Sequence, residues 1–154
     1  MAHAGQGFYI TFSAGTDFPT TTIGNINYKN WYEKDLTQGK SIPGNTSTKL
    51  YTEHCAAFFG CGSEKGDQSL PDDGILWSVM NGTNSVVNFC LSNNYPISST
   101  CGVQGGGGSQ LIYDNWIAGC YVPNGGYTCT VTSMNQSGDQ IAITYSLGLP
   151  ALKK

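Results

Sequence analysis

Apolar and polar residues alternate along most of this chain, which is the pattern of strands with one buried face. The alternation runs from Phe8 to Ser13, from Thr20 to Ile26 and from Thr48 toward Cys55, and denser apolar runs cover Gly74 to Met80 and Val86 to Leu91. Turn-forming residues separate these runs, and no stretch of ten or more residues shows helical spacing with caps. The pattern predicts an all-β fold, an antiparallel β-sandwich of about seven to nine strands.

The cysteines add cross-links to this sandwich. Six cysteines form an even set with no zinc-type spacing, so disulfides are expected. Asn124-Gly125 suits a two-residue hairpin turn that would set Cys120 opposite Cys129. The predicted pairs are Cys120–Cys129 from this hairpin register, and Cys55–Cys61 and Cys90–Cys101 from sequence proximity alone.

A second hairpin is predicted directly after the first. Alternating positions from Tyr127 to Thr132 and from Ile141 to Leu147 flank a turn over residues 135–139. Pairing across that turn sets Ile143 beside Val131, so the two strands would share an apolar face.

Composition limits the kinds of partner. A chain of 154 residues predicts one domain, 1–154, with residues 1–6 and 149–154 as flexible tails. Charged residues make up only 11%, arginine is absent and the net charge is -3, which argues against a nucleic-acid partner. No apolar run approaches the ~20 residues of a membrane span. Together with the disulfides, this predicts a secreted protein, which has either lost a signal peptide or left the cell by another route.

Aromatic residues outside the regular alternation are the candidate ligand-binding groups. The segment Tyr28 to Asp35 sets rings among charges and is expected to be a loop. Trp31 and Tyr32 could cap one end of the core, or form an exposed pair for a membrane interface or a sugar face. Trp116, beside Asp114 and Asn115, is expected to be exposed. The candidate lipid- or ligand-binding residues are Trp31, Tyr32, Trp116 and Tyr28.

Catalytic and metal-binding chemistry is not indicated. The only histidines are His3 and His54, and Glu53-His54-Cys55 could form a Cys/His pair only if Cys55 were reduced. The acidic loop from Glu64 to Asp73 could hold calcium, but its spacing does not match an EF-hand, and a solvated loop is expected. We therefore expect no enzyme activity, no cofactor and no metal site.

Taken as ordered blocks, the chain resembles the aegerolysins, including the small insecticidal crystal proteins of that type. The blocks are the opening strand Phe8 to Ser13, the tryptophan loop Asn30-Trp31-Tyr32, the turn Ile42-Pro43-Gly44, the strand Gly74 to Gly82, the strand and loop Val87 to Pro96, and the last strand Ile141 to Tyr145. Gly105 to Ser109 has the look of an engineered linker, but a natural glycine-rich loop between the last two blocks also suits the family.

The resemblance implies a sandwich that binds a membrane lipid and forms pores, often with a larger partner protein. Trp31 and Tyr32 would then belong to its membrane-facing end. The alternatives are a lectin-like protein, because Asn- and Asp-rich loops with aromatic platforms also suit sugars, and a secreted effector that binds a protein.

Overall fold

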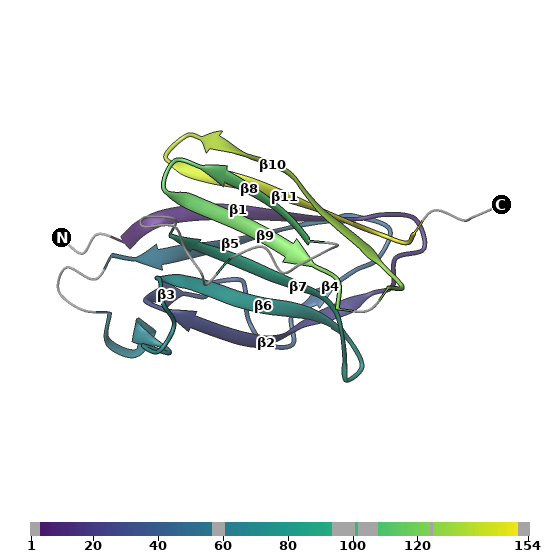
Figure 1. The fold of residues 1–154 in the computed structure, drawn as a ribbon, viewed down its shortest axis with the longest axis horizontal. Coiled ribbons are helices and arrows are strands. Elements are labelled where there is room, and N and C mark those ends of the chain that lie inside the picture. Colours follow the sequence, from purple (N-terminus) through teal and green to yellow (C-terminus); the bar gives the residue numbers. More distant parts are fainter. Residues whose placement is uncertain (1–3, 57–60, 94–100, 102–107, 124, 151–154) are drawn as a thin grey trace.

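The computed structural model describes residues 4–56, 61–93, 101, 108–123 and 125–150, which form two stacked β-sheets (Figure 1). Within these residues there are eleven strands and one short 3-10 helix, Gly62–Lys65. The strands are β1 (Ala4–Ala14), β2 (Thr21–Lys29), β3 (Trp31–Tyr32), β4 (Ser41–Ile42), β5 (Ser47–Cys55), β6 (Gly74–Asn81), β7 (Asn84–Asn93), β8 (Gly108–Tyr113), β9 (Trp116–Tyr121), β10 (Thr128–Ser137) and β11 (Gln140–Gly148).

The predicted β-sandwich is confirmed. The described residues form more strands than the seven to nine expected, because the structure adds β3 and β4, which at two residues each are too short to show an alternating pattern. β1 already begins at Ala4, inside the segment expected to be a tail, while residues 1–3 and 151–154 lie outside the described residues. Of the stretch Gly105 to Ser109, only Gly108 and Ser109 are described, and they begin β8.

The five-stranded sheet has the order β10-β11-β1-β5-β3. Its central strand β1 pairs antiparallel with β5 and parallel with β11, with Ile10 opposite both Leu50 and Ile143. This parallel pair departs from the antiparallel expectation. It places the first and last long strands of the described chain side by side, which hairpin turns alone cannot do.

The six-stranded sheet has the order β4-β2-β6-β7-β9-β8, and all its pairs are antiparallel. Two hairpins build most of it, β6–β7 around Gly82 and β8–β9 around Asp114. Both turn residues have positive φ angles, 65° and 56°, which glycine and aspartate tolerate in tight turns.

The core lies between the two sheets and is rich in aromatic rings. Phe12 of β1 stacks on Tyr145 of β11, and both rings meet Phe89 of β7 edge-on. Trp77 of β6 stacks on Phe89 at 5.2 Å between ring centroids. The buried Tyr145 hydroxyl donates a hydrogen bond of 3.1 Å to the Cys90 carbonyl, so one core side chain joins both sheets. Burial raises the pKa of Tyr145, which therefore remains a neutral donor.

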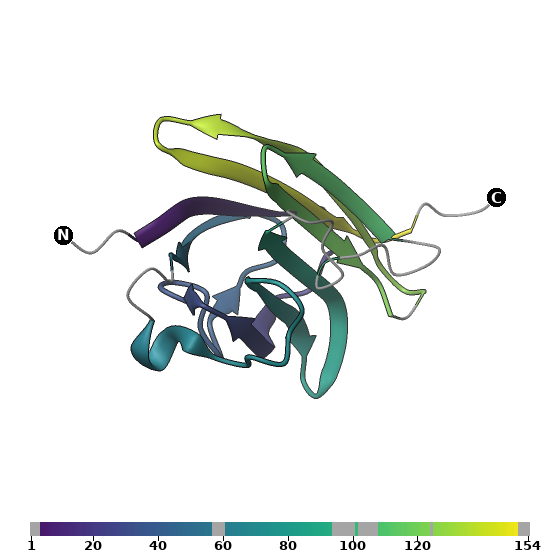
Figure 2. The same cartoon turned by 60° about the vertical axis from the view of Figure 1, so that its left-hand side comes forward.

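The edges of the sandwich meet on one side, where β8 lies along β10 (Figure 2). The Val131 backbone N–H donates to the Ser109 hydroxyl at 2.9 Å, which satisfies one donor of an edge strand. On the other side the edge strands β3 and β4 are too short to offer a long unpaired ladder.

The chain between Tyr121 and Thr128 does not form the predicted hairpin. β9 belongs to the six-stranded sheet and β10 to the five-stranded sheet, so this segment crosses from one sheet to the other. All three predicted disulfides, Cys55–Cys61, Cys90–Cys101 and Cys120–Cys129, are present. The Cys120–Cys129 pair is thus correct, but its bond spans two sheets rather than two neighbouring strands.

The second predicted hairpin is present with a different register. β10 continues to Ser137 and turns through Gly138, whose φ is 61°, so Met134 and not Val131 faces Ile143. A bulge after Val131 then shifts the ladder by one residue and pairs Val131 with Tyr145. The predicted five-residue turn is wrong. Residues 135–137 pair with β11 as part of β10, and only residues 138 and 139 form the turn.

Candidate functional site

Three of the four aromatic candidates lie together where β2 passes into β3. Asn30 separates the two strands with a φ of 53°, and its backbone N–H donates to the Lys65 carbonyl at 2.9 Å. Its carbonyl in turn accepts from the Cys55 N–H at 2.9 Å. The segment expected to be a loop is therefore held on both sides by backbone hydrogen bonds.

Trp31 belongs to the core rather than to an exposed face. Its side chain has no exposed surface, and its Nε1–H donates to the Thr52 hydroxyl at 2.7 Å. The ring stacks on Phe8 and meets Trp116 edge-on. The interpretation of Trp31 as a cap on one end of the core is confirmed.

Trp116 was expected to be exposed, and this is wrong. Only 7% of its surface is accessible, and its ring packs edge-on against Phe8. Trp116 begins β9 on the same face as Ala118 and Cys120, which are buried between the sheets. The adjoining polar residues Asp114 and Asn115 form the exposed turn, and the inward face of β9 starts one residue later.

Tyr28 and Tyr32 remain half-buried and line an open pocket of about 370 Å³. We call it the tyrosine pocket; it is lined by Tyr28, Trp31, Tyr32, Glu33, Lys34, Thr37, Ser63 and Glu64. The Lys34 ammonium lies 5.2 Å from the centre of the Tyr32 ring, at cation–π distance. Glu33 and Lys34, and the hydroxyls of Thr37 and Ser63, were not among the predicted site residues.

The electrostatics of the tyrosine pocket favour a positively charged group. Burial, followed by the charges of Glu33 and Glu64, raises the pKa of the Tyr28 hydroxyl. Burial also raises the pKa of Glu33, because a partly desolvated carboxylate is less stable than one in water. A cation beside these groups would lower both pKa values, because it stabilises their charged forms.

A polar network next to the pocket fixes its geometry. The His54 Nε2 and Asp73 Oδ2 atoms are 2.9 Å apart, and the Asn30 amide donates to Asp73 Oδ1 at 2.9 Å. The His54 ring lies against Trp31 and Trp116. The network links β5, the β2–β3 junction and the residue directly before β6.

Cys55 follows His54, but its sulfur is bonded to Cys61 and holds no thiolate for nucleophilic attack.

Among the described residues, no group of three or more His, Cys, Asp or Glu side chains could hold a metal ion. In the acidic loop, Asp67 accepts hydrogen bonds from the Asn27 amide and from Ser69, which lower its pKa. None of the helical structure in the described part of the chain is long and apolar enough to span a membrane.

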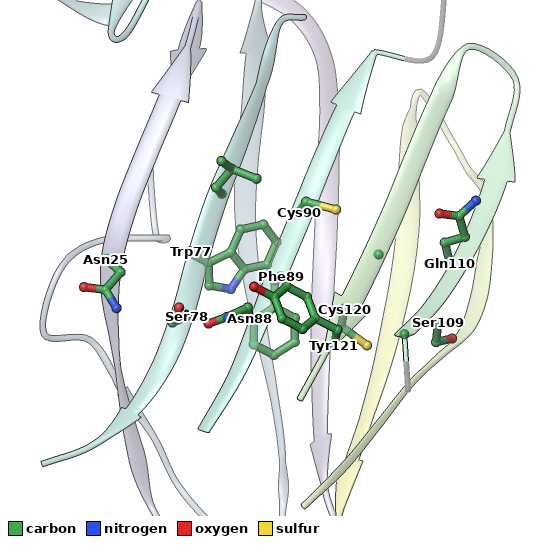
Figure 3. A pocket seen from close by; sticks show the side chains of 13 residues that line it. Asn25, Trp77, Ser78, Asn88, Phe89, Cys90, Ser109, Gln110, Cys120 and Tyr121 are labelled. Carbon is green, nitrogen blue, oxygen red and sulfur yellow. Dashed lines mark hydrogen bonds between the residues drawn. The ribbon is translucent and has the colours of Figure 1, made fainter. Parts of the chain in front are cut away.

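A second pocket, which the sequence analysis did not identify, lies on the outer face of the six-stranded sheet (Figure 3). We call it the outer-face pocket; its volume is about 370 Å³ and its lining comprises Asn25, Leu76, Trp77, Ser78, Asn88, Phe89, Cys90, Gly108, Ser109, Gln110, Gly119, Cys120 and Tyr121. The sequence did hold one sign of this pocket: outward residues of β7 and β9, such as Asn88 and Tyr121, alternate with core residues and lie opposite each other. That signal could not be used while β9 was assigned to a hairpin with β10.

Comparison with known proteins supports the fold assignment. No protein-family model and no curated protein matches the chain. The crystal structure of RahU in complex with a TRIS molecule aligns with a TM-score of 0.54 at 12% identity, covering 96% of this chain and 98% of RahU. The structure of IP-1A from Alcaligenes faecalis aligns with a TM-score of 0.50 at 13% identity, covering 99% of this chain and 96% of IP-1A. At these identities the likenesses show a shared fold over nearly the whole length of each chain.

Proposed function

We propose that this protein is a membrane-binding toxin component whose tyrosine pocket receives a zwitterionic lipid headgroup. The observation that carries the proposal is the meeting of Tyr28, Tyr32, two carboxylates and one ammonium in a single open pocket. The aegerolysin-like architecture supports the same class of function. Three disulfides are typical of an oxidising, extracellular environment, where such a protein would act.

The charges of the pocket match a phosphocholine or phosphoethanolamine headgroup. Aromatic faces and carboxylates attract the ammonium group, and the Lys34 ammonium attracts the phosphate. With Glu33 and Glu64 against one lysine, the lining carries more negative than positive charge. The chain as a whole has a net charge of -3, which does not favour docking on an anionic membrane.

Pore formation, alone or with a larger partner protein, belongs to the same proposal and rests on the architectural resemblance. Trp31 and Trp116 take part by supporting the pocket, because both rings pack behind it rather than facing solvent. Tyr28 and Tyr32 are the two predicted residues that a headgroup would contact.

The proposal is tested by co-sedimentation of the oxidised protein with vesicles of phosphatidylcholine and cholesterol, with and without sphingomyelin or ceramide phosphoethanolamine. Vesicles rich in phosphatidylserine are included as anionic membranes. We expect retention on at least one zwitterionic composition and a loss of about tenfold in affinity for Tyr32→Ala and for Glu33→Gln. Dye release from the same vesicles shows whether this chain forms pores without a partner.

A matched control is available in Tyr9→Ala. Tyr9 is also half-buried and carries Lys49 4.5 Å from its ring centre, but it lies on β1 and does not line the tyrosine pocket. Equal losses for Tyr9→Ala and Tyr32→Ala, or retention on the anionic vesicles alone, would contradict the proposal.

A further inference from the structure

The outer-face pocket is separate from the tyrosine pocket and differs from it in chemistry. Of the residues that the structure describes, none lines both pockets, and none of those lining the outer-face pocket is Lys, Asp, Glu or His. Its polar groups are the amides of Asn25, Asn88 and Gln110 and the hydroxyls of Ser78 and Tyr121, while the Ser109 hydroxyl is engaged by the Val131 N–H of β10. Such a lining offers no counter-ion, so it favours a neutral, polar ligand.

One buried acceptor in this pocket lacks a partner. The Gln110 Oε1 atom is buried and accepts no hydrogen bond. An unpaired buried carbonyl is less stable than one that is hydrogen-bonded. Figure 3 shows Gln110 reaching from β8 with this oxygen on the side of β9. A rotation of the partly exposed Gln110 side chain toward the pocket would let a ligand hydroxyl donate to this oxygen and supply the missing hydrogen bond.

Gly119 makes room for the Cys90–Cys101 disulfide beside the pocket. Gly119 is the direct neighbour of Gln110 across the β8–β9 ladder and of Cys90 across the β7–β9 ladder. A Cβ atom at Gly119 would lie 3.0 Å from the Cys90 sulfur and 3.3 Å from the Cys101 sulfur. The disulfide occupies the space that a side chain on Gly119 would need, so Gly119 and Cys90 give this part of the lining a backbone and sulfur surface.

Asn88 supplies a donor opposite this acceptor. Its Oδ1 accepts hydrogen bonds from the hydroxyls of Ser78 and Ser85, both at 2.5 Å. These two donors fix the amide orientation, and no described residue accepts a hydrogen bond from the Asn88 Nδ2 group. Within the described part of the chain, the pocket thus presents an oriented donor on β7 and an acceptor without a donor on β8.

A ring face completes the lining. Figure 3 shows the half-buried Tyr121 ring reaching from β9 across β7, on the same outer face as Asn88. Asn25 borders the pocket from β2, where a bulge and a φ of 53° turn the chain out of the regular ladder. Bulges of this kind re-aim side chains next to binding sites.

We propose that the outer-face pocket is a second binding site, which takes a neutral saccharide unit. A pyranose ring presents hydroxyls that both donate and accept, which suits Gln110 and Asn88, and an apolar C–H face, which suits the Tyr121 ring. The volume of about 370 Å³ lies in the range of small-ligand sites. The site is independent of the headgroup pocket and would add a second, sugar-specific contact with a target surface.

The test is a glycan array of neutral and sialylated oligosaccharides with the folded, oxidised protein, followed by calorimetric titration of the neutral glycan that gives the highest signal. We expect neutral glycans to bind and Gln110→Leu and Tyr121→Ala to weaken binding at least about tenfold. Gln110→Leu should leave the melting temperature unchanged or raised, since it removes an unpaired buried acceptor. The same glycan is then presented free and as a glycolipid in phosphatidylcholine vesicles, which distinguishes a soluble from a membrane-borne source.

Tyr32→Ala serves as the matched control, because it alters the tyrosine pocket and should leave glycan binding intact. Binding of no neutral glycan, binding of sialylated glycans only, or full affinity in a folded Gln110→Leu variant would overturn the proposal. Failure of glycan binding with intact retention on sphingomyelin vesicles would overturn this site alone and leave the headgroup pocket standing.

Discussion

Cys120 and Cys129 are bonded to each other although their strands lie in opposite sheets of the sandwich. Both residues are buried, and the bond closes the segment through which the chain passes from β9 to β10. The disulfide therefore adds a covalent link between the two layers beside the hydrogen bond from the Val131 N–H to the Ser109 hydroxyl.

Removing this bond should weaken the whole sandwich. For a sequence separation of 9 residues, the lost restriction of the unfolded chain corresponds to about 3 kcal/mol. We expect the double variant Cys120→Ala, Cys129→Ala to lower the free energy of unfolding by about this amount, measured by urea denaturation. An unchanged free energy of unfolding would show that packing alone holds the layers.

Trp31→Ala should mainly lower the stability of the fold, because Trp31 supports the tyrosine pocket from the core. The substitution removes a fully buried ring and its hydrogen bond to Thr52, at an expected cost of about 3–5 kcal/mol. Trp31→Phe keeps most of the packing and should cost about 1–3 kcal/mol through the lost hydrogen bond. Urea denaturation of both variants checks the order, and a Trp31→Ala protein as stable as the native one would contradict it.

Acid should destabilise the fold through Asp73. Burial alone would raise the pKa of Asp73, but hydrogen bonds from His54 and Asn30 and the charges of His54 and Lys29 outweigh it and lower the pKa. The folded protein therefore releases this proton more readily than the unfolded chain does. Its stabilising contribution is present above the ordinary pKa of 3.8 and is lost as the pH falls through the lower folded value.

Urea denaturation at neutral pH and at about pH 3 measures this contribution. Asp73→Asn should lower the free energy of unfolding at neutral pH and show a smaller further loss in acid than the native protein. Asp114→Asn, in the exposed β8–β9 turn, is the control and should follow the native curve. Parallel pH dependence of Asp73→Asn and the native protein would count against this role.

Gly66 should be needed for the shape of the tyrosine pocket. Its φ is 59°, and a Cβ atom there would lie 2.1 Å from the Tyr28 carbonyl oxygen. Gly82 has a similar φ of 65° but open space around it. We expect Gly82→Ala to cost about 1 kcal/mol for the left-handed backbone alone, and Gly66→Ala to cost more.

Thermal unfolding and vesicle retention distinguish these two glycine variants. Gly66→Ala should lose headgroup binding as well as stability, because Tyr28 must move away from the new methyl group. Gly82→Ala should retain binding. Identical behaviour of the two variants would mean that the contact between Gly66 and Tyr28 relaxes without disturbing the pocket.

The strands could be predicted from the sequence, whereas their assignment to sheets could not. Alternation shows that one face of Cys129 to Val131 is buried, but it does not say which sheet the strand joins. The hairpin over Asn124-Gly125 satisfied every local rule of turn chemistry, and the crossing between sheets was decided by long-range packing instead. The parallel pairing of β1 with β11 is likewise invisible to local patterns, because no turn connects the two strands.

Only part of the candidate site could be predicted from the sequence, for a related reason. Rings outside the strand alternation drew attention to Tyr28, Trp31 and Tyr32, and the structure does bring these three together. Sequence alone could not separate Trp31, whose ring turns inward, from Tyr32 beside it. Gln110 carried no signal, because a glutamine becomes unusual only when burial leaves its oxygen without a donor.

The central position of β1 has a consequence for how this protein is made. Its hydrogen-bonding partners are β5, synthesised soon after it, and β11, near the other end of the chain. Until residues 141–147 emerge from the ribosome, one flank of β1 remains an open template for other strands. The five-stranded sheet can therefore be completed only after β11 has been synthesised, and until then the hazard is a foreign strand that pairs with β1 in its place.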